Sequence, residues 1–90
     1  RDRHFMHFYV YMILTKINDK YLSYVGYTKN LQKRLSLHNE SKGAKFTKGK
    51  KWKIIFSKRY NSKSKAMREE YLLKKDFKKR NRIKINFIKK

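Results

Sequence analysis

A run of aromatic and branched aliphatic residues from His7 to Leu14 is the feature that most constrains the fold. Residues of this kind favour β-strands. Turn-forming residues follow at positions 16–20, and a second segment of similar character runs from Tyr21 to Tyr27. The two segments predict an antiparallel hairpin. If its loop has an even number of residues, two tyrosines converge on one face, which carries Tyr9, Tyr11, Ile13, Leu22, Tyr24 and Gly26.

A short amphipathic helix is expected directly after this hairpin. Thr28 is a suitable cap, and the helix is expected to run from Leu31 to His38 or Asn39. Residues at i, i+4 and i+7 form the inward stripe of such a helix, here Leu31, Leu35 and His38. Arg34 precedes His38 by four residues, so these two side chains are expected to share one edge of the helix.

The second half of the chain is expected to add a third strand over residues 52–60 and a long second helix. Ser62 or Ser64 can cap this helix, which is expected to reach about Arg80. Residues 83–88 favour either a short helix or a terminal strand. The predicted fold class is therefore α+β, with a three-stranded antiparallel sheet flanked by helices.

The charge of the chain indicates its partner. Lys and Arg total 27 against 6 Asp and Glu, for a net charge of +21. Residues 1–40 contain seven basic and three acidic residues (net +4), whereas residues 41–90 contain twenty basic and three acidic residues (net +17). Such a surface attracts polyanions, and nucleic acid is the expected partner. A membrane partner is not expected, because the basic segment 74–84 offers only Phe77 and Ile83 as an apolar face.

Length and cysteine content set further limits. Ninety residues suffice for one domain, predicted over residues 7–90, with residues 1–6 as an N-terminal extension. Met6 is a candidate native start, in which case residues 1–5 are an addition. No apolar run approaches the ~20 residues that span a bilayer. The chain has no cysteine, which agrees with a reducing compartment, and the expected location is cytoplasmic.

Five short motifs occur in a diagnostic order. Tyr9-Val10-Tyr11 is followed by Tyr24-Val25-Gly26, by Arg34 and His38, by the loop Gly43–Thr47, and by Ala66–Glu70. This order resembles the GIY-YIG nuclease superfamily, especially its small stand-alone members, over nearly the whole chain. Tyr9 stands where the superfamily name has glycine, a variation common among small members. The resemblance implies a metal-dependent endonuclease that hydrolyses phosphodiester bonds.

The resemblance also implies roles for five side chains. Glu70 is expected to bind the metal, and oxygen ligands suit Mg²⁺ or Mn²⁺. Arg34 is expected to hold a phosphate oxygen, since guanidinium matches its geometry. Tyr11 or Tyr24 is expected to act on the attacking water, with Tyr11 favoured, although a phenol with a pKa of about 10 is a weak base at neutral pH. His38 is expected to transfer a proton or bind phosphate. No organic cofactor is expected.

Lysines are expected to bind the nucleic acid backbone, mainly from a polar loop over residues 40–51. The candidates are Lys42, Lys45, Lys48, Lys50, Lys51 and Lys74. With no second recognition domain, we expect weak sequence specificity and a substrate of single-stranded or branched DNA, in which Phe46 or Trp52 could stack on unpaired bases. A non-catalytic basic binding module and an RNA-directed nuclease are the alternatives. The sequence does not define an oligomeric state.

Overall fold

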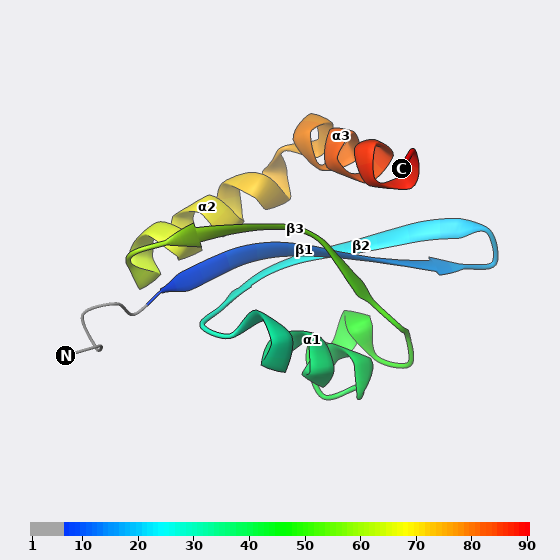
Figure 1. Ribbon diagram of the computed structural model, residues 1–90, viewed down its shortest axis with the longest axis horizontal. Helices are drawn as coiled ribbons and strands as arrows, with labels where there is room; N and C mark the ends of the chain where they lie inside the picture. Colours follow the sequence, from blue (N-terminus) through cyan, green and yellow to red (C-terminus); the bar gives the residue numbers. More distant parts are fainter. Residues whose placement is uncertain (1–6) are drawn as a thin grey trace.

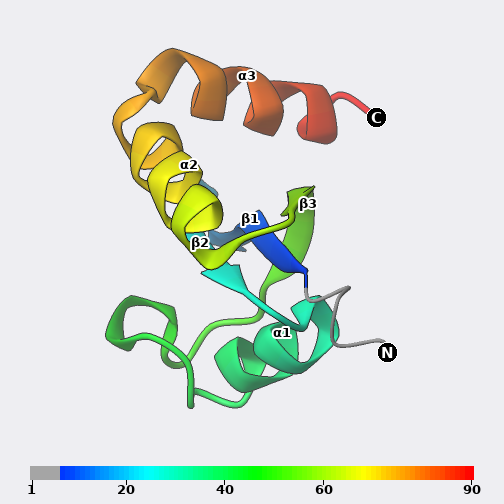
Figure 2. The ribbon, with the colours of Figure 1, turned by 90° about the vertical axis from the view of Figure 1, so that its left-hand side faces the viewer.

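The computed structural model describes residues 7–90, and the predicted extension at residues 1–6 lies outside them. The order of elements is β1 (Phe8–Ile17), β2 (Lys20–Thr28), α1 (Leu31–Asn39), the 3₁₀ helix η2 (Lys45–Thr47), β3 (Lys53–Tyr60), α2 (Lys63–Lys75) and α3 (Phe77–Ile88). One antiparallel sheet with strand order β2-β1-β3 lies between two layers (Figure 1). Helices α2 and α3 lie on one side of it, and α1 with the following loop lies on the other (Figure 2). The α+β prediction is confirmed.

The hairpin has the predicted register and a tighter turn than expected. Tyr11 pairs with Gly26 and Ile13 pairs with Tyr24, so these side chains share one face as predicted. The turn is only Asn18-Asp19, because both residues adopt positive φ angles, 50° and 65°. Consecutive positive φ angles match the twist of paired strands, and Asn and Asp tolerate them well. The strands therefore extend into the segment expected to form a longer turn.

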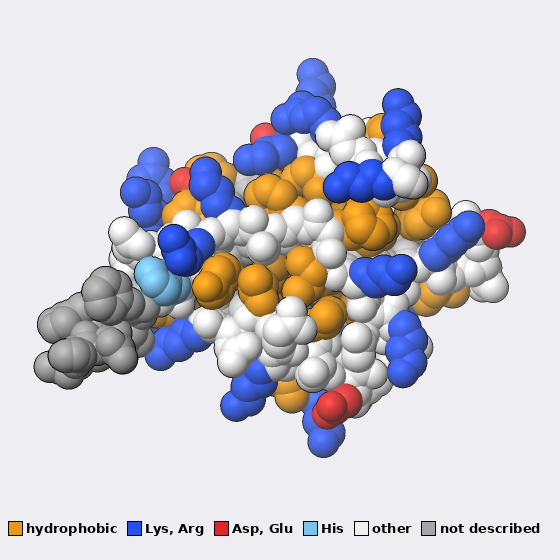
Figure 3. Space-filling model, viewed as in Figure 1, with side chains coloured by type: hydrophobic (Ala, Val, Ile, Leu, Met, Phe, Trp, Pro, Cys, Tyr) orange, Lys and Arg blue, Asp and Glu red, His pale blue; other side chains and the backbone are white. Residues whose placement is uncertain are grey.

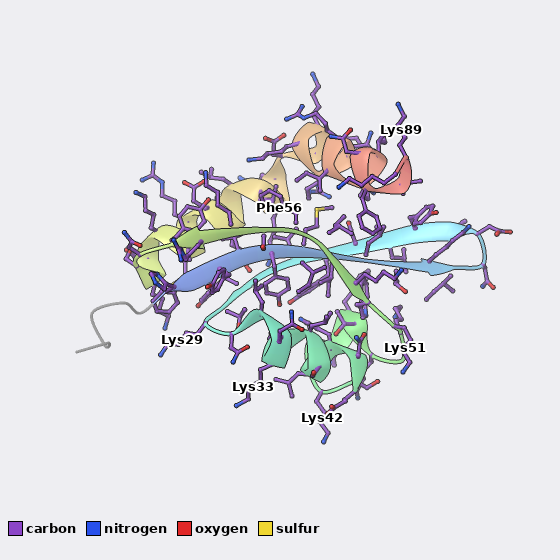
Figure 4. All side chains as sticks on the ribbon, viewed as in Figure 1. Lys29, Lys33, Lys42, Lys51, Phe56 and Lys89 are labelled. Carbon is purple, nitrogen blue, oxygen red and sulfur yellow. The ribbon has the colours of Figure 1, made fainter. Side chains whose placement is uncertain are left out.

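The central strand β1 separates two hydrophobic clusters. On the α2 and α3 side, Met12 and Val10 pack with Val25, Ala66 and Leu73. Phe56 packs against this cluster from β3, between the sheet and the helices (Figure 4). The α1 side holds the second cluster, formed by Tyr11, Ile13 and Trp52 with partly buried Leu22, Tyr24, Leu31, Leu35 and Ile54. Trp52 is 3% exposed in this core, so of the two aromatic residues considered for base stacking it is not available at the surface.

The helices begin and end at different residues from some of those predicted. Asn30, not Thr28, caps α1 by accepting a hydrogen bond from the Lys33 backbone N–H at 3.0 Å. Ser62 caps α2 as expected. The prediction of a single long helix was wrong, because α2 ends at Lys75. The carboxylate of Asp76 accepts a hydrogen bond from the Lys79 backbone N–H and so caps a separate helix, α3.

Residues 83–88, for which the sequence favoured either a helix or a strand, are helical and belong to α3. Ile83 packs against the apolar cluster under α2. No helix within residues 7–90 has the length and apolar character needed to cross a membrane.

Candidate active site

Tyr11 lies at the centre of the site, on the middle strand of the sheet. Its side chain is 2% exposed, and its ring crosses over Gly26 on the neighbouring strand. A Cβ atom at position 26 would lie 2.5 Å from the Tyr11 hydroxyl oxygen. Glycine at this position therefore provides the room that the phenol needs, and this explains why the second tripeptide ends in glycine.

Helix α1 brings Arg34 and His38 to the hydroxyl of Tyr11. The Nε–H of Arg34 donates to the Tyr11 oxygen at 3.4 Å, and the Nε2 atom of His38 lies 2.8 Å from the same oxygen. His38 is fully buried. The spacing of four residues puts both side chains on one edge of the helix, as predicted, and both of them reach the Tyr11 hydroxyl.

The loop after α1 closes over the other side of the His38 ring. The Nδ1 atom of His38 lies 2.8 Å from the hydroxyl oxygen of Thr47, which is also fully buried. Gly43 lies directly against the imidazole, and a Cβ atom there would collide with Nδ1. Trp52 holds the loop in place, since its indole N–H donates to the Thr47 carbonyl at 3.1 Å.

These contacts determine which nitrogen of His38 carries the proton. The Thr47 hydroxyl has one proton, and it donates this proton to the Ala44 carbonyl at 2.9 Å. Thr47 can therefore only accept from His38, so the proton of the neutral imidazole is on Nδ1. The Nε2 atom is then an acceptor, and Tyr11 donates to it. The result is a directed chain from Tyr11 through His38 and Thr47 to Ala44.

Burial and charge adjust the pKa values of this chain. Burial raises the pKa of Tyr11, and the hydrogen bond and positive charge of Arg34 oppose that effect. Burial also lowers the pKa of His38, and the nearby charge of Arg34 lowers it further. The hydrogen bond to Tyr11 raises the pKa of Arg34. At neutral pH the site therefore holds a neutral phenol, a neutral imidazole and a guanidinium cation.

Tyr24 lies in the same layer, where its hydroxyl helps to raise the pKa of Arg34, but it takes no part in the hydrogen bonds that link Tyr11, His38 and Thr47. The edge of its ring contacts His38, with centroids 5.2 Å apart, and its face lies near the ring of Phe46. Tyr11 and not Tyr24 thus has the partner that can remove its proton. This difference favours Tyr11 among the two candidates that the sequence left open.

Glu70 comes from α2, the layer on the other side of the sheet. Its carboxylate is 3.4 Å from the Lys74 ammonium, and its side chain is 18% exposed. The negative charge of Glu70 is one of the influences that raise the pKa of Tyr11, although the two side chains come from opposite sides of the sheet. Within residues 7–90 no three His, Asp or Glu side chains gather into a metal-binding group. A metal here would have Glu70 as its carboxylate ligand, with water and phosphate oxygens completing its coordination. This donor set fits Mg²⁺ or Mn²⁺.

Five of the six predicted nucleic-acid-binding lysines lie between α1 and β3, and the sixth, Lys74, lies on α2 and is paired with Glu70. Lys42, Lys45, Lys48 and Lys51 are exposed on the loop after α1. Lys50 instead donates to carbonyl oxygens of its own loop, those of Phe46 and Lys48, at 3.0 and 3.2 Å. Lys42 and Lys51 point away from the sheet, as do Lys29 and Lys33 (Figure 4). Lys and Arg side chains also surround the apolar surface seen in Figure 3.

Three residues at or beside the site were not identified from the sequence. Thr47 had no assigned role, although the Gly43–Thr47 motif itself was noticed. Lys29 and Lys33 line a cavity of about 340 Å³ together with Arg34, and neither was among the predicted contacts. Their positions immediately before and within α1 were the available signal, because a phosphate held by Arg34 would lie near them.

Comparison with known proteins identifies the family. The sequence model of the GIY-YIG catalytic domain matches residues 7–84. The chain therefore belongs to the GIY-YIG family, a family of nucleases.

Its relatives are small proteins of similar length. UPF0213 protein OB0043 of Oceanobacillus iheyensis is 43% identical over 65 residues, which cover 71% of this chain and 74% of that protein. UPF0213 protein SAG0778 of Streptococcus agalactiae is 40% identical over 80 residues, covering 88% and 86%. The solution NMR structure of UPF0213 protein BH0048 from Bacillus halodurans is 31% identical, with a TM-score of 0.47 over 91% of this chain and 85% of that one. These names state no substrate.

Proposed function

We propose that this protein is a metal-dependent endonuclease that hydrolyses DNA phosphodiester bonds with weak sequence specificity. The observation that carries the proposal is the directed chain from Tyr11 to Ala44, combined with Arg34 on the same hydroxyl. A structural tyrosine does not need a buried imidazole that is held in its accepting tautomer. Together with membership of a nuclease family, this arrangement favours hydrolysis over binding alone.

In the proposed reaction the Tyr11 oxygen accepts a proton from the attacking water while its own proton moves to Nε2 of His38. The resulting hydroxide attacks phosphorus, and the bond from phosphorus to the leaving oxygen breaks. That oxygen departs with the bonding electrons and takes up a proton from solvent. This route does not require a free phenolate before the reaction begins, which agrees with the raised pKa of Tyr11. His38 becomes an imidazolium, and its Nδ1–H remains bonded to Thr47.

In this proposal Arg34 directly, and Glu70 through the metal ion that it holds, stabilise the negative charge that develops on the phosphate. Only the Nε–H of Arg34 is engaged by Tyr11, so its terminal N–H groups can donate to a phosphate oxygen as negative charge develops there. Glu70 would hold Mg²⁺ or Mn²⁺ on the side of the site toward α2. When bound, such an ion would supply Lewis-acid stabilisation of the phosphate and of the leaving oxygen.

The surface supports a substrate recognised through its backbone. Exposed lysines on the loop at residues 42–51 bind phosphates as point charges, without regard to base identity. We infer that unpaired or branched DNA is preferred, because Phe46 is 48% exposed next to the site and can contact a base only where the base is unpaired.

A cleavage assay with a matched pair of variants tests the proposal. The purified chain is incubated with labelled single-stranded, duplex and flapped DNA, with Mg²⁺, with Mn²⁺ and with EDTA. We expect internal cuts with either ion and none in EDTA. Glu70→Gln should abolish cutting, whereas the control Glu69→Gln, one position along the same helix, should retain it because that side chain lines a different cavity, next to Tyr60.

The same assay separates the two alternatives. Binding without cutting under every condition would contradict the proposal and identify a basic binding module. Preferential cutting of a matched RNA strand would contradict the choice of DNA. Circular dichroism of each variant establishes that a loss of cutting is not a loss of folding.

A further inference from the structure

Phe46 is held in an exposed position by the same loop that holds His38. It lies in η2 between Lys45 and the buried Thr47. Its ring is 48% exposed and lies close to that of Tyr24, with an interplanar angle of 19° and centroids 6.3 Å apart. This separation is typical of offset pairs, in which neither ring covers the whole face of the other. Trp52 supports the ring of Phe46 from another side, with centroids 6.1 Å apart.

A cavity of about 320 Å³ opens beside these rings. Its walls are Ser23, Tyr24 and Val25 of β2, Phe46 of η2, Lys74 of α2 and Arg80 of α3. The cavity thus lies at the free edge of the sheet, where the two layers come together. It has an aromatic wall on one side and two cations on the other. This volume suits a group the size of one nucleotide and not a duplex.

The two cations of this cavity, Lys74 and Arg80, are held in place by neighbouring groups. Lys74 is paired with Glu70 at 3.4 Å, so this cavity adjoins the candidate metal ligand. Arg80 is fixed at the junction of α2 and α3, because its Nε–H donates to the Leu73 carbonyl at 3.1 Å. Among the hydrogen bonds within residues 7–90, this is the single one made by the Arg80 side chain. The terminal N–H groups of Arg80 are therefore available to donate to a phosphate.

We propose that this cavity is a subsite for one unpaired nucleotide of a DNA strand, with its base stacked on Phe46 and its phosphate on Lys74 and Arg80. The inference rests on the proposed function for the identity of the ligand as DNA. It adds a specific position at which the strand is held beside the scissile bond. In a duplex, neighbouring base pairs cover both faces of each base, so this contact is available only to unpaired DNA.

An abasic scan tests the subsite directly. A single abasic site is moved through the unpaired flap of a labelled branched DNA, whose junction fixes the register of the strand, and binding is measured by fluorescence anisotropy in EDTA, where intact DNA is verified on a gel. For the unsubstituted chain we expect one position at which loss of the base weakens binding by about 5- to 100-fold, as for one stacked base. Phe46→Ala should weaken binding to the intact strand by a similar factor. It should also remove the dependence on that position.

Controls separate stacking from other effects. Tyr21→Ala removes another exposed aromatic ring, at the hairpin tip, and should leave the scan unchanged. Phe46→Trp should retain the effect. Phe46→Leu keeps an apolar contact with Tyr24 and Trp52 but cannot stack, so it should behave as Phe46→Ala even if the alanine variant folds poorly. The affinity of the Phe46 variants for duplex DNA should differ from that of the unsubstituted chain by less than twofold.

Two outcomes would overturn the subsite. In the first, Phe46→Leu binds the intact strand as tightly as the unsubstituted chain does. In the second, the Phe46 variants lose the same factor at every abasic position, which would mean that the ring supports the loop and not a base. Because binding is measured without cleavage, either result is distinct from failure of the proposed nuclease, which appears as absence of cutting with Mg²⁺ or Mn²⁺.

Discussion

The two faces of the sheet are built from adjacent residues of one strand and differ in kind. Even-numbered residues of β1, such as Val10 and Met12, enter an apolar cluster under α2 and α3. On the opposite face, Tyr11 meets His38 and Thr47, which are both fully buried and polar. Burying polar groups costs free energy unless each of them is hydrogen-bonded. The α1 face satisfies every member of its chain, and does so in a defined direction.

This difference shows how a small domain combines stability with chemistry. A chain of ninety residues buries a modest core, so its stability is limited. One face contributes most of the purely apolar packing, whereas the other gives up part of its apolar area to position a reactive group. Substitutions of neighbouring residues on the two faces should therefore have opposite consequences for activity and stability.

The largest effect is expected at Tyr11. Tyr11→Phe keeps the packing and removes the oxygen that joins water to His38, so the cleavage rate should fall by about 10²- to 10⁴-fold, as is typical for loss of a general acid–base group. Single-turnover cleavage measures the rate, and thermal unfolding measures stability. Stability should fall by about 1–3 kcal/mol, because the buried Nε2 atom of His38 loses its hydrogen-bond donor. A rate within threefold of the unsubstituted chain would assign the reaction to another base.

The neighbouring residue should behave in the opposite way. Met12→Ala removes a fully buried side chain from the apolar face, and we expect a loss of about 2–5 kcal/mol in the free energy of unfolding. Urea titration at low temperature measures this loss. Met12→Leu is the volume-conserving control and should cost less than about 1.5 kcal/mol. The protein that remains folded should cut at the normal rate, and a slower rate would show that the two faces are coupled.

A smaller effect on both properties is expected at Thr47. Thr47→Val keeps the shape but leaves the Nδ1–H of His38 without its acceptor, which should cost about 1–3 kcal/mol of stability. It also releases the constraint on the tautomer, so cutting should slow by about tenfold and its pH profile should shift. Thr47→Ser restores the hydroxyl and should restore both. If the valine variant loses stability but keeps the rate and pH profile, Thr47 is a structural residue only.

The sequence was a good guide where periodicity determines structure. The alternation of side chains in β1 and β2 put Tyr11 on the same face as Gly26 and Tyr24, and the four-residue spacing in α1 put Arg34 and His38 on one edge of the helix. These relations depend on local geometry. The break between α2 and α3 was missed because neither proline nor glycine marks it, and Asp76 acts there only through its capping hydrogen bond.

The role of Thr47 could not be predicted for a different reason. It lies nine residues after His38, in a polar segment whose path depends on Trp52 being buried and on Gly43 lying against the imidazole. No local pattern contains these contacts. The same is true of the cavity at Phe46, whose walls come from β2, η2, α2 and α3, between residues 23 and 80. Tertiary folding brings these groups together.

The smallest effect is expected from pH, and its sign follows from the buried His38. Its pKa is lower in the folded protein than its ordinary value, so the unfolded chain takes up this proton first as pH falls. The stabilising contribution of neutral His38 is therefore complete above about pH 6.5 and is lost as pH falls through the folded pKa. The loss cannot exceed about 1.4 kcal/mol per pH unit for one proton.

Activity should respond to the same group at a lower pH than stability does. Folded His38 stays neutral and able to accept from Tyr11 until the pH reaches its lowered pKa, so cutting per folded molecule should remain constant as stability begins to fall. Urea titrations and cleavage rates between pH 7.5 and about pH 5, above the range in which carboxylates titrate, measure both curves. His38→Gln is the control, because a glutamine does not titrate and the difference in stability between the two proteins isolates the histidine. If cutting declines in step with the ordinary titration near pH 6.5, the pKa of His38 is not lowered in the folded protein, and the buried polar chain that distinguishes the two faces does not hold His38 in its neutral form.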